Sequence, residues 1–150
     1  MTENRASLPS RPWHLWLVGV LSILWNSLSC LDFTMVITRN ADYLEAAGFT
    51  AEQMDFFYSY PAWAYALWAV AVWWAWFGGA LLLARKSLAV SVYLTGLIAY
   101  VAAMIRQYGF TEFSELFPEA HYKVMSAVIF VLAVAELYYA RKMRDKGVLS

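Results

Sequence analysis

Four long stretches of almost uninterrupted apolar residues limit what this chain can fold into more than any other feature. They cover residues 13–37, 61–84, 87–108 and 118–140. A helix that crosses a bilayer needs about 20 consecutive, mostly apolar residues, and each stretch is long enough. Because backbone polar groups cannot stay unpaired in lipid, such stretches fold as helices. The sequence therefore predicts an all-α integral membrane protein, with residues 1–150 forming a single four-helix transmembrane bundle.

The composition agrees with a bilayer as the main solvent. Apolar residues make up 62% of the chain and charged residues 15%, whereas soluble domains have roughly 45–50% and roughly 25%. A soluble domain of this length has too small an interior to hide so much apolar surface. The formal net charge is zero, which argues against nucleic acid as a partner. The expected partner is the lipid bilayer.

Basic residues are unevenly divided between the two ends of the predicted bundle. The two tails and the second connection lie at one end and hold most of them: Arg5, Arg11, Arg85, Lys86, Arg141, Lys142, Arg144 and Lys146. The other two connections hold most of the acidic residues. Because short basic segments stay on the cytoplasmic side of a membrane, we expect both termini to face the cytoplasm.

The first outer connection, residues 38–60, carries the signals of a short amphipathic helix. Thr50 and Gln53 have the spacing of a capping box, in which each side chain bonds the backbone N–H of the other residue. Phe49 and Met54 occupy the matching positions of a hydrophobic staple. We therefore expect an ordered segment that either lies on the outer membrane surface or folds over the mouth of the bundle.

Charged and polar residues inside the spans are the candidates for function, because each is costly in lipid. Three of them, together with Arg39 just after the first span, would form a polar ligand-binding site at the outer mouth of the bundle: Asn26, Asp32 and Arg106. The competing interpretation is structural. In it Asp32 forms an ion pair with Arg39 or Arg106, and Asn26 fixes the register of the first helix through a hydrogen bond. We favour the ion pair, because Asp32 is close to the membrane interface and basic partners are in reach.

A second acidic residue, Glu136, is expected in the fourth span. On the predicted limits it lies about one turn from the inner end. Its expected partners are Arg85, Lys86 or His14, in a structural clamp. A proton-coupled transporter would place such a carboxylate nearer to the middle of the bilayer.

The sequence lacks the common motifs of catalysis and metal binding. His14 and His121 fall at opposite faces of the membrane, so they cannot share a metal ion. There is no His-Glu-x-x-His, no Gly-x-Ser-x-Gly and no Gly-rich phosphate loop. The single cysteine, Cys30, excludes an internal disulfide. We therefore expect no enzyme, no catalytic residue, no metal and no cofactor.

A set of residues in the first part of the chain carries a resemblance to known proteins. It comprises Arg-Pro-Trp-His at 11–14, Leu-Trp-Asn at 24–26, Asp-Phe at 32–33, Thr-Arg-Asn at 38–40, Tyr-Leu at 43–44, Phe-Thr at 49–50, Glu-Gln at 52–53 and Pro-Ala-Trp at 61–63. In these residues the chain resembles a group of small four-span bacterial inner-membrane proteins, some of which are automatically labelled sugar transporters. Beyond residue 63 the resemblance covers only the four-span pattern. It implies a bacterial cytoplasmic-membrane location and transfers neither a substrate nor a catalytic residue.

Two functions stay open on these grounds. The first is an accessory or structural membrane protein, as a homo-oligomer or within a larger membrane complex. The second is a transporter of a small polar solute, for example a sugar, with the polar site at the outer mouth. A transporter needs a polar path on both sides of the midplane, usually with broken helices or an internal repeat. No proline lies inside any span and no repeat is clear, which favours the accessory role.

Overall fold

The computed structural model describes residues 12–150, and helices make up most of this part of the chain. Four helices are long and apolar enough to cross a bilayer: α1 (Trp13–Ile37), α4 (Ala62–Leu83), α5 (Leu88–Gly109) and α7 (Ala120–Asp145). The described residues contain no β-strand. The prediction of an all-α bundle is confirmed, and the chain is a multi-pass membrane protein. Arg5 and Arg11, which contribute to the predicted orientation, lie outside the described residues.

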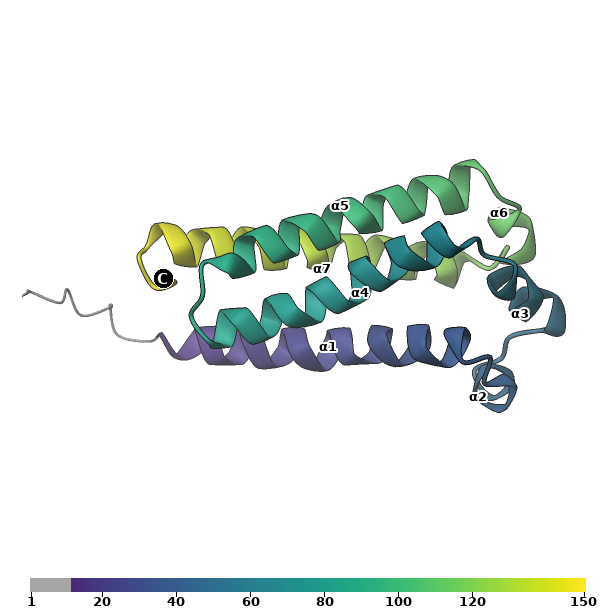
Figure 1. Ribbon diagram of the computed structural model, residues 1–150, viewed down its shortest axis with the longest axis horizontal. Coiled ribbons are helices and arrows are strands. Elements are labelled where there is room, and N and C mark those ends of the chain that lie inside the picture. The colour runs from purple at the N-terminus through teal and green to yellow at the C-terminus, as the bar shows by residue number, and fades with distance from the viewer. Residues whose placement is uncertain (1–11) are drawn as a thin grey trace, which may run out of the picture.

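The four long helices lie side by side in the order α1, α4, α5 and α7 (Figure 1). α4 packs closely against both α1 and α5, and α7 packs mainly against α5. The first and last of these helices, α1 and α7, have few contacts with each other. The bundle is therefore tight along α4 and α5 and more open between α1 and α7.

The remaining helices are short and gather at one end of the bundle, which we call the capped end. They are α2 (Ala41–Ala46), α3 (Ala51–Tyr58) and α6 (Phe113–Leu116) (Figure 1). The opposite end, which we call the tail end, holds the turn between α4 and α5 together with residues 146–150. In the predicted orientation the capped end faces outward and the tail end faces the cytoplasm.

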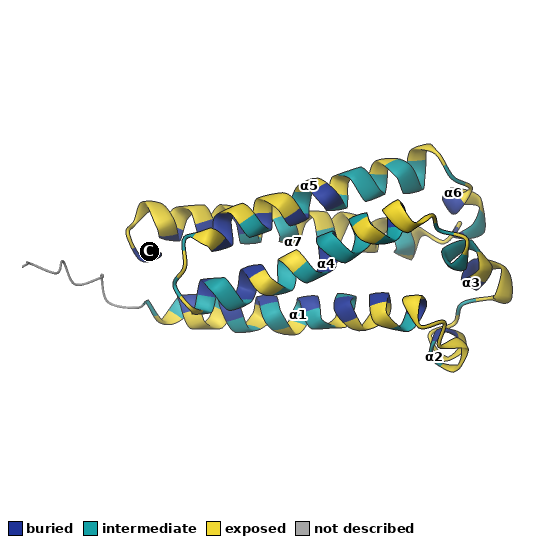
Figure 2. Ribbon diagram, in the orientation of Figure 1, coloured by how far each residue is buried: buried dark blue, intermediate teal, exposed yellow. Residues whose placement is uncertain are grey.

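The exposed and buried residues of α1 repeat with the period of a helix that borders lipid. The exposed leucines follow one another at steps of three or four residues: Leu17, Leu21, Leu24, Leu28 and Leu31. The buried residues follow a similar spacing on the other face: Leu15, Gly19, Ser22, Asn26, Cys30, Phe33 and Val36. Figure 2 shows this buried face turned toward α4. A leucine stripe of this kind is favourable against hydrocarbon.

Small residues allow α4 to approach both of its neighbours. A Cβ atom at Gly78 would lie 2.7 Å from the ring of Tyr93 on α5. A Cβ atom at Gly79 would lie 3.0 Å from Oγ of Ser22 on α1. In lipid, where no hydrophobic drive joins helices, such close approach is a main source of association. The small residues of α4 are therefore needed for packing.

The predicted capping box is present at the start of α3. Thr50 Oγ1 accepts from the Gln53 backbone N–H at 3.3 Å, and Gln53 Oε1 accepts from the Thr50 N–H at 3.1 Å. The Gln53 amide also donates to the carbonyl of Leu116 at 2.8 Å, which joins α3 to α6. Phe49 and Phe57 line the cavity described below. Of the two expected placements, the segment therefore adopts the one over the mouth of the bundle.

Two of the long helices end in an arginine with a left-handed backbone. The φ angle is 54° at Arg39, after α1, and 59° at Arg85, after α4. Glycine usually takes this position, as Gly48 and Gly147 do at the ends of α2 and α7. An arginine there costs roughly 1–2 kcal/mol of backbone strain. At Arg39 the turn places the guanidinium 5.1 Å from the centre of the Tyr58 ring.

The last residues of the chain fold back against the tail end. The Ser150 backbone N–H donates to the Arg85 carbonyl at 2.8 Å, and the Ser150 carbonyl accepts from the Ser87 N–H at 2.9 Å. Val148 and Leu149 are buried there with residues from all four long helices: Leu15, Leu82, Ala89, Val90, Tyr93, Leu137, Ala140 and Met143. The tail half of the bundle is therefore a packed apolar core.

Candidate functional site

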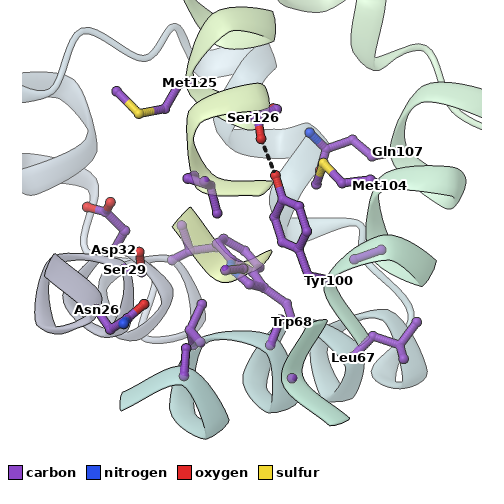
Figure 3. A pocket seen from close by; sticks show the side chains of 18 of the residues that line it. Asn26, Ser29, Asp32, Leu67, Trp68, Tyr100, Met104, Gln107, Met125 and Ser126 are labelled. Atoms are coloured by element: carbon purple, nitrogen blue, oxygen red, sulfur yellow. Dashed lines mark hydrogen bonds between the residues drawn. The ribbon is translucent and has the colours of Figure 1, made fainter. Parts of the chain in front are cut away.

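A cavity of about 410 Å³ lies in the half of the bundle nearer to the capped end. Every long helix lines it, and aromatic rings of the capped end close it above. The space exists because small side chains face it, among them Ala71, Ala75, Gly96 and Ala133. Figure 3 shows it surrounded by side chains of all four long helices.

A chain of hydrogen bonds forms the floor of the cavity. Asn26 Nδ2 on α1 donates to Glu136 Oε1 on α7 at 3.0 Å and to the Ser22 carbonyl at 2.9 Å. The Ser22 hydroxyl lies 2.9 Å from the Tyr93 hydroxyl on α5. Asn26, Tyr93 and Glu136 all line the cavity. The carboxylate at the floor, Glu136, therefore has a neutral hydrogen-bond partner in Asn26.

Two of the three basic residues that the sequence suggested as partners of Glu136 form other contacts. The His14 Nδ1 atom lies 2.5 Å from the Tyr139 hydroxyl. Arg85 Nε donates to the Val148 carbonyl at 2.9 Å. No ion pair joins Glu136 to His14, Arg85 or Lys86 among the described residues. Glu136 is thus held by Asn26 and not by the expected basic partner.

The position of Glu136 along the bundle follows from its neighbours. Its partner Asn26 is close to the midpoint of α1 (Trp13–Ile37). The next residue along α7, Leu137, belongs to the apolar core of the tail end. Glu136 therefore lies where the cavity meets the core of the tail half. That it lies about one turn from the inner end of the membrane span stays a prediction.

Aromatic side chains form much of the cavity wall and its roof. Trp25, Trp68 and Tyr100 line the wall, and the Tyr100 hydroxyl donates to the Ser126 carbonyl at 2.7 Å (Figure 3). At the capped end Phe117 is buried to 1% exposure and stacks on Phe113, with ring centres 4.4 Å apart. Aromatic rings therefore contribute to both the wall and the roof of the cavity.

Arg106, one of the predicted site residues, lies at the roof of the cavity. Its guanidinium is 4.2 Å from the centre of the Tyr60 ring and 5.5 Å from that of the Trp63 ring. Burial raises the pKa of Tyr60 to about 12, although the Arg106 charge works in the opposite direction. Tyr60 is therefore neutral at physiological pH, and the two rings hold Arg106 by cation–π contacts.

Asp32 has a different partner from either of the two that the sequence suggested. The Tyr43 hydroxyl on α2 donates to Asp32 Oδ1 at 2.6 Å. No ion pair joins Asp32 to Arg39 or Arg106, whose guanidinium groups both lie against aromatic rings. The hydrogen bond to Asp32 raises the pKa of Tyr43, so the phenol stays protonated and able to donate at neutral pH.

The opening of the cavity lies between α1 and α7. Asp32 on α1 and Met125 on α7 both line the cavity, and both are exposed. In Figure 3 they lie on one side of the cavity, opposite Tyr100 and Gln107. This agrees with the sparse contact between α1 and α7. A molecule can therefore enter from the capped half, past Asp32.

The structure brings together most of the residues that sequence analysis singled out. Asn26, Asp32, Arg106 and Glu136 line the same cavity, whereas Arg39 does not. Three contributors to the site were not among the predicted site residues, because tyrosine is common in this chain: Tyr43, Tyr93 and Tyr100. Only the packing of α2 and α5 shows that their hydroxyl groups meet polar partners.

The hydrogen bond between Asp32 and Tyr43 can be tested by a double-mutant cycle on the free energy of unfolding. Asp32→Asn and Tyr43→Phe should each lower the free energy of unfolding by about 0.5–1 kcal/mol, since both groups are partly exposed. Their effects should be coupled, because either change removes the same bond. Since the Tyr43 pKa is raised on folding, this stabilisation is present at neutral pH and is lost only above about pH 10.

Thermal unfolding in detergent measures this cycle. Arg39→Gln is the matched control, because Arg39 is close in sequence and contacts Tyr58 instead. If the effect of Asp32→Asn is coupled to that of Arg39→Gln and not to that of Tyr43→Phe, Asp32 forms the ion pair expected from the sequence, and the hydrogen bond to Tyr43 is contradicted.

Comparisons with models of protein families, with curated proteins and with solved structures found no match for this chain. The function is therefore inferred from the residues that line the cavity.

Proposed function

We propose that this chain is a membrane-embedded binding protein for a small molecule, with its site open to the outer side of a bacterial cytoplasmic membrane. The observation that carries this proposal is the cavity that ends at a carboxylate in the middle of the bundle. Sites for small molecules are typically concave, mostly apolar and supplied with a few polar groups that fix orientation. A cavity of about 410 Å³ falls within the usual size range,.

A purely structural role explains these features less well. Intramembrane carboxylates that serve packing alone are usually neutralised by a basic partner, and Glu136 has Asn26 instead. A ligand that lies in the cavity and contacts Glu136 would account for this carboxylate.

Transport of a small solute is a second candidate, and the depth of Glu136 favours it. Transporter sites usually lie near the bilayer midplane, and Asn26, the partner of Glu136, is close to the midpoint of α1. Below this level the tail half of the bundle is packed apolar core. The proposed binding function needs only the described conformation, whereas transport would require these helices to separate at the tail end.

Filling the cavity tests the proposed function. Ala133 lines the cavity one turn from Glu136, and a phenylalanine there would occupy the space. Val134 is its neighbour on the same helix and is exposed, so Val134→Phe is the matched control. The wild type and both variants are purified from bacterial membranes, and the small molecules that accompany them are extracted and compared by mass spectrometry.

We expect the wild type and Val134→Phe to carry a common molecule that Ala133→Phe lacks. If all three preparations yield the same molecules in the same amounts, nothing is held in the cavity and the proposed function fails.

A further inference from the structure

The charges around the cavity restrict the kind of molecule that fits it. We propose, resting on the binding function above, that the ligand is a small organic cation: an amine or quaternary ammonium group attached to an aromatic or apolar body. The cationic group would bind at Glu136, and the apolar body would lie along the aromatic wall.

The first observation is the charge balance at the floor. Glu136 accepts a hydrogen bond from the Asn26 amide. The hydrogen bonds continue from Asn26 to the Ser22 hydroxyl and from there to the Tyr93 hydroxyl. None of these groups carries a positive charge. A carboxylate removed from water needs a compensating charge or its proton. A cationic ligand supplies that charge at the end of the cavity.

The second observation is that a further carboxylate lies at the opening. Asp32 lines the same cavity and is bound by the Tyr43 hydroxyl, which is neutral. A molecule that enters between α1 and α7 passes Asp32 before it reaches Glu136. Two carboxylates along one path attract a cation and repel an anion.

The single basic residue among those that line the cavity, Arg106, does not reverse this preference. Its guanidinium is occupied by the Tyr60 and Trp63 rings at the roof. Along α5, Arg106 is separated from Tyr93, at the floor, by roughly 20 Å at 1.5 Å per residue. Its effect on a cation beside Glu136 is therefore much weaker than that of Glu136 itself.

The third observation is the aromatic wall. Trp25, Trp68 and Tyr100 line the space between the opening and the floor. Ring faces attract cations, and quaternary ammonium groups are often bound by surrounding rings. The same rings give an apolar or aromatic body a favourable surface. An uncharged sugar could also stack on these rings, but it would leave the Glu136 carboxylate without a compensating charge,.

A matched pair of probes tests the charge preference directly. Benzyltrimethylammonium and neopentylbenzene have the same shape, but the first has a positively charged nitrogen where the second has a carbon. Binding is measured by the change in tryptophan fluorescence, because Trp25 and Trp68 line the cavity. The protein is held in nanodiscs of phosphatidylcholine, whose zero net charge keeps lipid from concentrating the cation.

We expect wild-type protein to bind the cation more tightly than the uncharged probe. Glu136→Gln should weaken binding of the cation roughly 10- to 100-fold, the effect of losing a contact with a charged group. It should leave the uncharged probe unaffected, which also shows that the variant is folded. Glu119→Gln, at an acidic residue that does not line the cavity, should change neither affinity.

Equal binding of the two probes to wild-type protein, unchanged by Glu136→Gln, would overturn the cation preference and leave the binding function standing. Failure of the cation to bind wild-type protein would also overturn the inference. The proposed binding function is tested separately, by comparing the small molecules that co-purify with the wild type and with Ala133→Phe.

Discussion

Replacing Phe117 with alanine should remove about 3–5 kcal/mol from the free energy of unfolding of the capped end. Phe117 is 1% exposed and is surrounded by rings. Its ring centre lies 4.4 Å from that of Phe113, 5.0 Å from that of Tyr122 and 5.5 Å from that of Phe57. Truncation leaves a hole that this cluster cannot easily close, because each neighbouring ring is also held by others.

Hydrogen exchange followed by mass spectrometry measures the effect where it arises. Exchange over α3 and α6 should accelerate, while the middle of α5 stays protected. Phe110→Ala is the control, since Phe110 belongs to the same connection but is 80% exposed, and it should change stability by at most about 0.5 kcal/mol. Equal effects of the two changes would mean that the ring cluster does not hold the capped end together.

A leucine at Gly78 should destabilise the contact between α4 and α5 by about 1–3 kcal/mol or more. Even a Cβ atom there would lie 2.7 Å from the Tyr93 ring. The ring cannot move away freely, because its hydroxyl is 2.9 Å from Ser22 Oγ and the residue is buried. Since Tyr93 belongs to the cavity floor, the same change should also weaken binding of a ligand at Glu136.

Gly109 supplies the control for this substitution. It ends α5, and no atom lies within 4 Å of the Cβ position there, so Gly109→Leu should have little effect on the melting temperature. Comparable losses at both positions would show that glycine itself, and not the contact with Tyr93, determines the result.

Much of the fold follows from local patterns in the sequence. Residues 13–37 were expected as the first span, and α1 has the same limits. The spacing of Thr50 and Gln53 predicted a capping box, and both of its hydrogen bonds are present. Such features depend on residues a few positions apart, which is why the sequence is sufficient to locate them.

The partners of the charged residues were harder to predict. Asp32 was expected to bind an arginine, since opposite charges in reach of one another are the simplest pair. Its partner is Tyr43, brought close by the turn after α1. Glu136 was expected to pair with a basic residue of the tail end, and its partner is Asn26 on α1. Both errors concern how separate elements meet, which depends on packing and not on local pattern.

The central claim is that the cavity reaches the middle of the bundle from the capped end and is closed toward the tail end. Cysteine labelling tests it most directly, on a Cys30→Ser background in spheroplasts. A small, positively charged methanethiosulfonate reagent is added from outside to variants with one cysteine each: Ser29→Cys and Ala133→Cys in the cavity, and Leu28→Cys and Val134→Cys on exposed faces as controls.

We expect the reagent to modify the cysteines at positions 29 and 133 and to leave those at positions 28 and 134, which face lipid, largely unmodified. Lys146→Cys, at the tail end, should react only after the membrane is opened. A cysteine at position 133 that reacts no faster from outside than one at position 134, or that reacts only from the cytoplasmic side, would contradict the account.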